Sequence, residues 1–480
     1  MPDRNEIAAS LGDSLLAMTD GLACRAEGNF PVRLLIAILC LATAAGSAAQ
    51  VSAAGHDSVQ AAIDANPGKM IHVAAGDYVI GRALRITEDN TGLYGEGRIV
   101  QSNPEESILE IFRESGTVTG VRVSGLTFTR AEGREESHRH GVLASDCADL
   151  DLDNIRVVDN WSNAGTIQLQ RCAASRVHGC SVINYKRVCV DDRTESDLYG
   201  YAFRVIDGTG ITVSESTGII VQDNRVIERR LFPTEETKTT HQLGQLTDGK
   251  RPMNKGRLAP AGGYANNWHQ GSAIVVTSPE ETDHILVTGN YIENAGQGVD
   301  IHADHVTCGQ NIIKYAFIGI KCMHGSRNVI INGNNVSHMD LWGLVMLPGT
   351  ASHPAEAATD TQPARLPNYT RGNIIANNIF SDFGFGYEYF NWKDATGRVI
   401  SLESGQLAEN PVMCDVIVQG NIVYDSGRDQ VIENGVPTTV PPRYEYAVFI
   451  DQNPAPQGLL FSNNIFHPGS EGVSNVPLPE

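Results

Sequence analysis

Ionisable side chains alternate with apolar ones in the segment QGVDIHADH, residues 297–305. Asp300, His302 and Asp304 are separated by Ile301 and Ala303. In a β-strand, side chains two positions apart point to the same face, so this spacing predicts one polar row of two carboxylates and an imidazole. Imidazole changes its protonation near neutral pH, and a carboxylate beside it can orient it. The row therefore indicates proton-transfer chemistry, provided that a fold positions it.

The same pattern of apolar alternation, Asn, short strand, polar turn and further strand recurs along the chain. It is visible in HILVTGNYIENAGQGVDIHA (284–303), NVIINGNNVSHMDLWGLVML (328–347) and NIIANNIFSDFGFGYEYF (373–390). Asn290, Asn311 and Asn335 mark the repeat, with spacings of 21 and 24 residues. A repeat of this length cannot bury its own apolar side, but stacked repeats can.

Stacked repeats predict an all-β fold, a single-stranded right-handed parallel β-helix. Each strand would pair in parallel with its copy in the next coil, ~4.8 Å away. The recurrent Asn would form a hydrogen-bonded ladder at one turn. A β-sandwich would show hairpin signals, and a propeller would show a longer and more regular period, so both are disfavoured.

Aligning the strands that follow the polar turn predicts which side chains are neighbours. The aligned segments are TIQLQ (166–170), VCVDDR (188–193), SAIVVT (272–277), VDIHAD (299–304), IKCMH (320–324) and LVML (344–347). Asp300 then lies beside Lys321, and His302 lies beside Met323. We take His302, Asp300, Lys321 and Asp191 as candidate catalytic residues. His324 and Asp304 are candidate substrate-binding residues. An isolated Asp–Lys pair on a solvated face would instead be a structural ion pair of little energetic value.

The repeat segments resemble the right-handed parallel β-helix superfamily of pectate-lyase-like proteins. The segment DSVQAAIDANPGKMIHVAAGDYVI, residues 57–80, is similar to the start of such domains, where a short amphipathic helix caps the coil stack. The resemblance spans residues 55–475 as one domain and implies a carbohydrate-active protein. That superfamily includes lyases, hydrolases, epimerases, fructan-converting enzymes and adhesins, so the fold does not choose the activity.

Two insertions, residues 229–270 and 348–371, interrupt the repeat. Long loops on a rigid scaffold often carry binding functions. The first contains Tyr264, Trp268 and His269, and Trp342 lies in DLWG. These side chains are candidates for stacking against a sugar ring.

Asp300-x-His302 also resembles, locally, the Asp-Pro-His element of mannuronan C5-epimerases, with Ile301 in place of Pro. The resemblance implies a lyase or epimerase reaction on a polysaccharide. His302 would abstract a proton, Lys321 would neutralise a uronate carboxylate, and Asp300 would orient or protonate the sugar.

Three alternatives remain open at this stage. A glycoside hydrolase or a fructan-converting transferase would use a pair of carboxylates, for which Asp191, Asp192, Asp300 and Asp304 are candidates. A non-catalytic polysaccharide-binding β-helix would present the polar row as a solvated face. No cofactor is required, although Asp191, Asp192 and Glu195 suggest a possible Ca²⁺ site.

Composition and the N-terminal segment restrict the setting. The 480 residues carry 36 Lys+Arg and 56 Asp+Glu, a net charge of −20, which argues against a nucleic-acid partner. PVRLLIAILCLATAAGSAAQ, residues 31–50, has the basic flank, short apolar core and small residues of a secretory signal, so residues 1–54 are expected to be an extension with a signal peptide. The protein is then secreted or periplasmic, without stable membrane insertion. Cys147 and Cys172, 25 residues apart, form the one disulfide candidate. The sequence does not indicate the oligomeric state.

Overall fold

The computed structural model describes the chain from Val51 to Pro479 with gaps. The described residues are 51–133, 137–186, 191–194, 202–203, 208–229, 266–267, 271–349, 351–383, 397–404, 410–425, 431–433, 435–438 and 442–479. Residues 51–480 form one compact unit, separate from residues 1–50. No helix among the described residues has the length and apolar character needed to cross a membrane.

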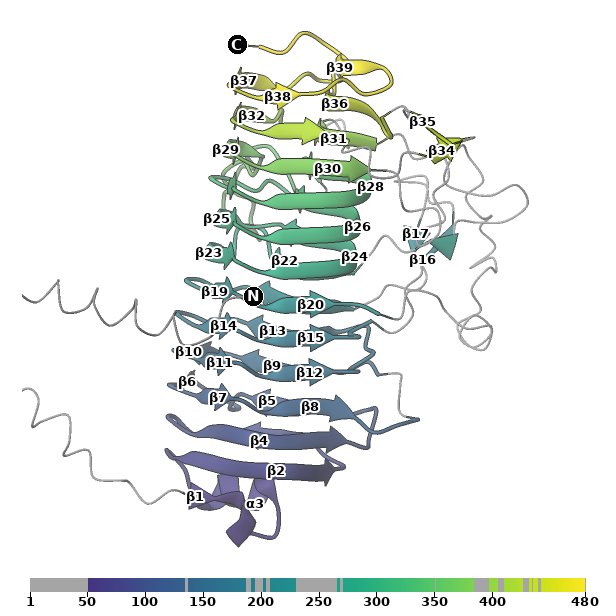
Figure 1. Cartoon of the computed structure of the whole chain (residues 1–480). Coiled ribbons are helices and arrows are strands. Elements are labelled where there is room, and N and C mark those ends of the chain that lie inside the picture. The colour runs from purple at the N-terminus through teal and green to yellow at the C-terminus, as the bar shows by residue number, and fades with distance from the viewer. Residues whose placement is uncertain are drawn as a thin grey trace, which may run out of the picture. The chain divides into compact units, whose positions relative to one another are not determined.

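Parallel strands stack in successive coils, as Figure 1 shows, and the fold is a parallel β-helix. Each coil contributes strands to three columns. The first column contains β7 (Arg122–Ser124), β11 (Asp151–Asp153), β14 (Arg176–His178), β19 (Ile220–Gln222), β23 (Asp283–Thr288), β25 (Asp304–Gly309), β27 (Ile330–Asn332), β29 (Arg371–Ala376), β32 (Cys414–Gln419) and β37 (Gln457–Ser462).

The second and third columns follow the first in each coil. The second contains β8 (Thr127–Arg130), β12 (Arg156–Val158), β15 (Ser181–Ile183), β20 (Arg225–Ile227), β30 (Ile379–Phe383), β33 (Ile422–Tyr424) and β38 (Ile465–Phe466). The third contains β3 (Leu84–Ile86), β5 (Leu109–Ile111), β9 (Val142–Ser145), β13 (Gly165–Gln170), β18 (Thr209–Ser214), β22 (Ser272–Thr277), β31 (Gly397–Leu402), β36 (Tyr444–Ile450) and β39 (Gly472–Ser474).

Long strands pass from one column to the next without a break. β24 (Tyr291–Ile301), β26 (Ile312–Cys322) and β28 (Asn335–Met346) begin in the second column and end in the third. In the first coils, β1 (Val51–Ser52), β2 (Met70–Ile80) and β4 (Gly92–Gln101) pair in sequence. Short pairings outside the columns join β6 (Val118–Thr119) to β10 (Cys147–Ala148), and β34 (Val431–Glu433) to β35 (Val436–Thr438).

Inward side chains stack on their copies to make the core. Val299, Ile320 and Leu344 occupy one such row in the third column, and each is fully buried. A fully buried Val, Leu or Ile contributes ~1.5–3 kcal/mol relative to an exposed one. The apolar alternation of the repeats thus supplies the continuous core that one repeat lacks.

The predicted asparagine ladder is present at the corner between the first and second columns. Each side-chain carbonyl accepts the backbone and side-chain N–H groups of the Asn in the preceding coil, at 2.9–3.1 Å. The ladder contains Asn224, Asn290, Asn311, Asn334, Asn378, Asn421 and Asn464. Asn334, and not the predicted Asn335, belongs to the ladder; Asn335 is exposed. The residue before each ladder Asn has the left-handed conformation, and in this coil that residue is Gly333.

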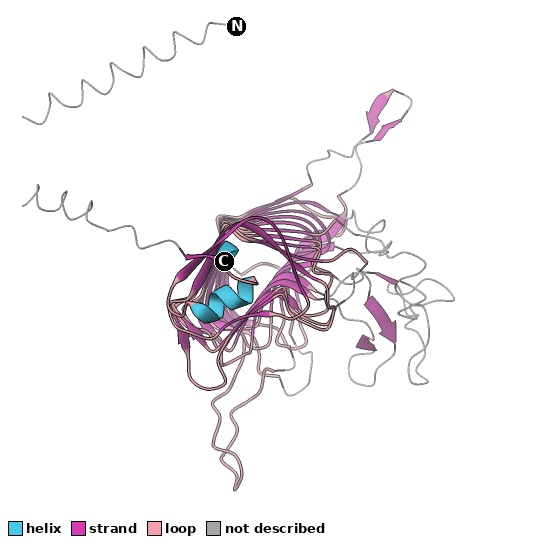
Figure 2. Ribbon diagram, turned by 90° about the horizontal axis from the view of Figure 1, so that it is seen from below, coloured by secondary structure: helices cyan, strands magenta, loops and turns pink. Residues whose placement is uncertain are grey.

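A short helix closes the N-terminal end, as predicted. α3 (Val59–Ala65) follows the 3₁₀ turn η1 (Ala53–Gly55), and Ser58 caps it by accepting a hydrogen bond from Ala61 N. Val59, Ala62 and Ile63 are buried, and Figure 2 shows the helix lying across the end of the coil. The helix therefore covers core side chains that would otherwise meet water.

Candidate active site

A polar cluster on the third column surrounds Asp300. Asp300 lies near the end of β24, His302 follows that strand, and Lys321 lies on β26. The predicted lateral register is confirmed, because Asp300 pairs with Lys321 and Ile301 with Cys322. The Asp300 carboxylate lies 2.7 Å from His302 Nε2 through Oδ1 and 2.9 Å from Lys321 Nζ through Oδ2. One buried carboxylate thus joins two basic groups.

Burial makes this cluster electrostatically unusual. The side chain of Asp300 is 6% exposed, that of Lys321 is 11% exposed and that of His302 is 13% exposed. Burial alone would raise the pKa of Asp300, but His302 when it is protonated, together with the charge of Lys321, outweighs it and holds the pKa below its ordinary value. Asp300 is therefore ionised at neutral pH, and it balances the charge of Lys321.

Two residues of the neighbouring coil complete the surroundings of Asp300. Ser272 Oγ donates to Asp300 Oδ2 at 3.3 Å or to Gln297 Oε1 at 3.2 Å. Thr277 Oγ1 lies 3.1 Å from His302 Nδ1. Both residues belong to β22, the strand aligned beside Asp300, so the lateral alignment of SAIVVT was the signal that could have identified them.

His324 lies against His302 from the next coil. The ring centroids are 4.6 Å apart and the ring planes meet at 85°. Burial, together with the charges of His302 and Lys321, lowers the pKa of His324 to about 3, so this ring is neutral at neutral pH. Its Nδ1 accepts the N–H of Ala351 at 3.2 Å, which leaves the ring hydrogen on Nε2.

Gly349 closes over the same ring. It has φ +65°, and a Cβ at this position would lie 2.4 Å from His324 Nδ1. His324 itself has φ +64°. The loop after β28 thus holds His324 by a close backbone approach that only glycine permits.

The prediction that Asp304 shares this face was wrong. The chain turns after Ile301, and Asp304 begins β25 in the first column, where it pairs with Asp283. Arg327 binds its carboxylate through Nε at 3.0 Å, through its backbone N–H at 2.9 Å, and through Nη2. Asp304 therefore belongs to a different face, in a surface hollow of about 510 Å³ lined also by His305, Asn328 and Arg371.

The prediction that VCVDDR forms a rung of the stack was also wrong. β13 pairs with β18, and Asp191 instead lies on β16 (Asp191–Thr194). That strand pairs antiparallel with β17 (Ala202–Phe203) and β21 (Asn266–Asn267). Antiparallel pairing takes Asp191 out of the parallel columns, and the side chains of Asp191 and Asp192 lie outside the described residues.

Of the aromatic candidates, only Trp342 lies within the described residues. Trp342 lies on β28 beside Ile318, which pairs in turn with Gln297 of the Asp300 strand. Its Nε1 is buried and has no hydrogen-bond partner within the part of the chain that the structure describes. Tyr264, Trp268 and His269 lie outside the described residues, as does Glu195 of the suggested Ca²⁺ site.

Cys147 and Cys172 are free thiols, so the predicted disulfide is not formed. Both are buried on adjacent coils. Their sulfur atoms approach backbone carbonyls, Cys147 Sγ at 3.3 Å from Ile111 O and Cys172 Sγ at 3.6 Å from Ala144 O. They pack as small core residues.

One set of described residues has the composition of a cation site. Ligand atoms of Asp283, His284 and His305 lie within 4.8 Å of one another on the first column. The two imidazole rings stack at 4.7 Å with an interplanar angle of 10°, which does not aim both ring nitrogens at one point. Metal binding there would require a ring to rotate.

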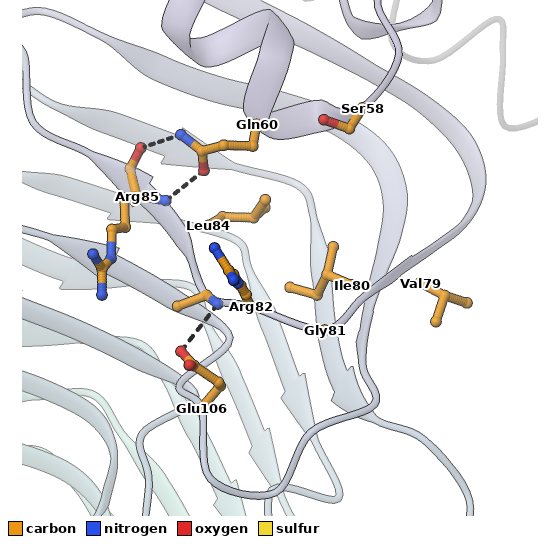
Figure 3. Close-up of a pocket in the computed structure, with 10 residues that line it drawn as sticks. Ser58, Gln60, Val79, Ile80, Gly81, Arg82, Leu84, Arg85 and Glu106 are labelled. Atoms are coloured by element: carbon orange, nitrogen blue, oxygen red, sulfur yellow. Dashed lines mark hydrogen bonds between the residues drawn. The ribbon is translucent and has the colours of Figure 1, made fainter.

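A hollow of about 910 Å³ beside the capping helix is a structural feature of the first coil (Figure 3). The Gln60 side chain accepts from Arg85 N at 2.8 Å and donates to Arg85 O at 3.1 Å. This amide pairs with the backbone of β3 as a neighbouring strand would. The hollow carries none of the groups of the Asp300 cluster.

Comparison with known proteins supports the fold and leaves the activity open. No family model matches the chain, and no curated protein matches it. The family 28 exopolygalacturonase of Yersinia enterocolitica has a TM-score of 0.51 at 11% identity, with 89% of this chain and 78% of that chain covered. At such identity the likeness establishes the β-helix fold alone.

Two further solved structures resemble the chain more weakly. The A-module of the Azotobacter vinelandii mannuronan C-5 epimerase AlgE6 has a TM-score of 0.46 at 12% identity, covering 89% of this chain and all of that chain. The Dettilon tailspike protein has a TM-score of 0.47 at 13% identity, covering 84% of this chain. The chain spans 64% of that tailspike.

Proposed function

We propose that this chain is a carbohydrate-active enzyme that acts on a uronate-containing polysaccharide by proton abstraction, as a lyase or a C5-epimerase. The observation that carries the proposal is the buried Asp300 carboxylate between His302 and Lys321, with the neutral His324 against His302. The secretory signal predicted for residues 31–50 fits this proposal, because such a substrate lies outside the cell.

His302 is the base in this proposal. Asp300 Oδ1 lies 2.7 Å from its Nε2 as a charge contact, although neither atom makes a hydrogen bond among the described residues; in this proposal the ring hydrogen lies on Nε2 and the lone pair on Nδ1. Nδ1 faces the hydroxyl of Thr277 at 3.1 Å, a position that a sugar group would take on binding. A C5 proton passes to Nδ1, and its electron pair moves into the C5–C6 bond to give an enediolate.

Lys321 and His324 stabilise the charge that this step creates. Before transfer, the charges of Asp300 and Lys321 cancel. After transfer, protonated His302 leaves the cluster with one net positive charge opposite the enediolate. The Nε2–H of the neutral His324 donates to the substrate carboxylate. Return of a proton to the opposite face of C5 gives the epimer, and loss of the O4 substituent gives an unsaturated end.

Two-carboxylate hydrolysis receives less support from the described residues. Both oxygens of Asp300 are engaged by basic groups, and both oxygens of Asp304 are engaged by Arg327. A glycosidase needs one carboxyl group free to donate a proton and another free to attack or to activate water. Neither aspartate is available for that role.

The test is a screen of the purified chain against uronate and neutral polysaccharides. Ultraviolet absorbance reports unsaturated uronate ends, a reducing-end assay reports hydrolysis, and proton NMR reports epimerised residues. His302→Ala should lose at least ~10²-fold in rate, the usual contribution of a general base. His467→Ala, an exposed imidazole on the last coils, is the matched control and should keep full activity.

Reducing ends without unsaturated or epimerised products would contradict proton abstraction and point to hydrolysis. Binding without turnover on every substrate would point to a non-catalytic polysaccharide-binding β-helix. Full activity in His302→Ala would remove the assignment of the base.

A further inference from the structure

One outward row of the first column changes its chemistry along the β-helix. In the N-terminal coils it holds Arg122, Asp151 and Arg176, which form ion pairs of 2.7 Å (Asp151–Arg176) and 3.9 Å (Arg122–Asp151). From Ile220 onward the register replaces these charges with neutral, mostly aliphatic residues. The row continues through Leu286, Thr307, Ile330, Ile374, Ile417 and Leu460.

The adjoining row of the second column changes at the same place. Arg98, Arg156 and Arg225 point outward in the N-terminal coils and are exposed. In the later coils the same row is Tyr291, Ile312, Asn335, Ile379, Ile422 and Ile465. Charged side chains are thus replaced by aliphatic ones on both sides of the asparagine corner.

We name these two rows in the later coils, from Leu286 to Leu460 and from Ile312 to Ile465, the aliphatic strip. Five of its side chains are 36–56% exposed: Ile312, Ile330, Ile379, Leu460 and Ile465. The outward residues between the two rows are uncharged: Thr288, Gly309, Asn332, Ala376, Gln419 and Ser462. The strip is therefore a continuous neutral surface, whereas the whole chain carries a charge of −20.

The strip has the extent of a specific protein interface. At ~4.8 Å per coil its rows of five and six residues extend about 25 Å, and at ~3.3 Å per residue the distance across the corner is about 20 Å. Each copy would bury about 500 Å² and two copies about 1,000 Å², the smallest area expected of a specific interface. An exposed apolar surface of this size on a soluble protein marks an interaction site.

A second copy of this chain fits the strip better than a carbohydrate does. Sugar binding needs polar groups that orient hydroxyls and flat aromatic faces, and Tyr291 is the one aromatic residue in the two rows. A second copy presents the same rows at the same ~4.8 Å spacing, so the aliphatic side chains of two antiparallel copies interdigitate along the full length. Its neutral surface also avoids the repulsion between two acidic chains.

We propose that the aliphatic strip is the face on which two copies of this chain associate. The contact is isologous, with the same rows contributed by both copies. It lies on the first and second columns, whereas the Asp300 cluster lies on the third. Association on the strip therefore leaves the proposed site unchanged.

The test is the mass of the full chain in solution, measured by sedimentation velocity over a concentration series. We expect a dimer for the wild-type chain. Ile330→Lys combined with Ile374→Lys places two charges in the middle of the strip at outward positions, so the core is untouched. We expect the dimer dissociation constant to rise about a hundredfold or more, because each charge would be buried without a partner.

Ser181→Lys is the matched control. It adds a lysine to the same outward row of the second column, on the charged N-terminal coils, and should leave the dimer intact. Circular dichroism and melting curves confirm that each variant folds. A monomeric wild-type chain at all concentrations would overturn the proposal, as would a dimer that the double substitution leaves unchanged. A monomer that floats with lipid vesicles and loses this binding on double substitution would assign the strip to a membrane surface instead.

Discussion

Asp300 and Asp304 are four residues apart and lie on two faces of the same corner. Both bind basic side chains, but the side chains differ in kind. Asp300 lies between a lysine and a histidine, with a second histidine behind the first. Asp304 is held by Arg327 through two charged N–H groups and one backbone N–H. Both carboxylates are largely buried, at 6% exposed for Asp300 and 11% for Asp304, and the arginine that holds Asp304 is 28% exposed.

The difference separates the proposed proton-transfer site from a structural link. Arginine keeps its charge at every accessible pH, so the Asp304–Arg327 pair has one protonation state and joins two coils. The Asp300 cluster contains two imidazoles in different surroundings, one beside a carboxylate and one kept neutral by burial. A buried imidazole whose pKa is strongly lowered, as that of His324 is, is a mark of a candidate acid–base site.

Asp300→Asn should have the largest effect. It leaves Lys321 buried without its counter-charge and releases the orientation of His302. We expect the free energy of unfolding to fall by about 3–5 kcal/mol, measured by urea denaturation, and any polysaccharide activity to be lost. The double variant Asp300→Asn with Lys321→Met removes both charges and should recover part of the stability without recovering activity. A single variant as stable as the wild type would contradict the importance of this buried charge.

Asp304→Asn should cost less. It weakens a pair in which Asp304 is 11% and Arg327 is 28% exposed but keeps a side chain that can accept the arginine N–H groups, and we expect a loss of about 1–2 kcal/mol in the same denaturation assay. Activity at permissive temperature should remain. A loss of activity equal to that of Asp300→Asn would show that both faces of the corner take part in the reaction.

His324 should make stability depend on pH. Its folded pKa of about 3 lies below its unfolded value, so between these values the unfolded chain binds more protons, and stability falls as pH decreases from about 6.5 toward 3. An asparagine at position 324 can keep the left-handed conformation of His324, and its side-chain oxygen can accept the hydrogen bond from Ala351 N–H. His324→Asn should therefore remove about 1 kcal/mol of the decrease in stability between about pH 6.5 and about pH 5.5.

The control for this measurement is the pH range. The contribution of Asp300 to the stability of the fold is also lost in acid, because its pKa is lower in the folded chain than in the unfolded chain. That loss begins only as pH falls below about 4. A decrease that begins near pH 6.5 in the wild type and persists in His324→Asn would assign it to another group.

His305→Ala should have the smallest effect. The ring is exposed and contacts His284 and Asn328 on the first column. We expect a change within about 0.5 kcal/mol in unfolding free energy and unchanged activity. A larger change on addition of Zn²⁺ to the wild type than to the variant would show that the Asp283, His284 and His305 group binds a cation.

Most of the fold could be predicted from the repeat, because in stacked coils the repeat spacing determines which side chains are lateral neighbours. The lateral pairing of Asp300 with Lys321 and the asparagine ladder both follow from the repeat spacing. The same reasoning failed at Asp304, since alternation holds only within a strand and the chain turns after Ile301. It failed at VCVDDR because the alignment assumed a parallel rung, whereas the described strand Asp191–Thr194 pairs antiparallel outside the stack.

The sequence by itself determined the coil stack, the capping helix and the neighbours across coils, because these depend on local periodicity and on burial of apolar rows. Only the tertiary structure decided that the ring of His324 meets that of His302 and that Asp300 is enclosed. Those features depend on how corners and loops approach in space. Burial and proximity set the pKa values, and neither is written in the spacing of residues along the chain.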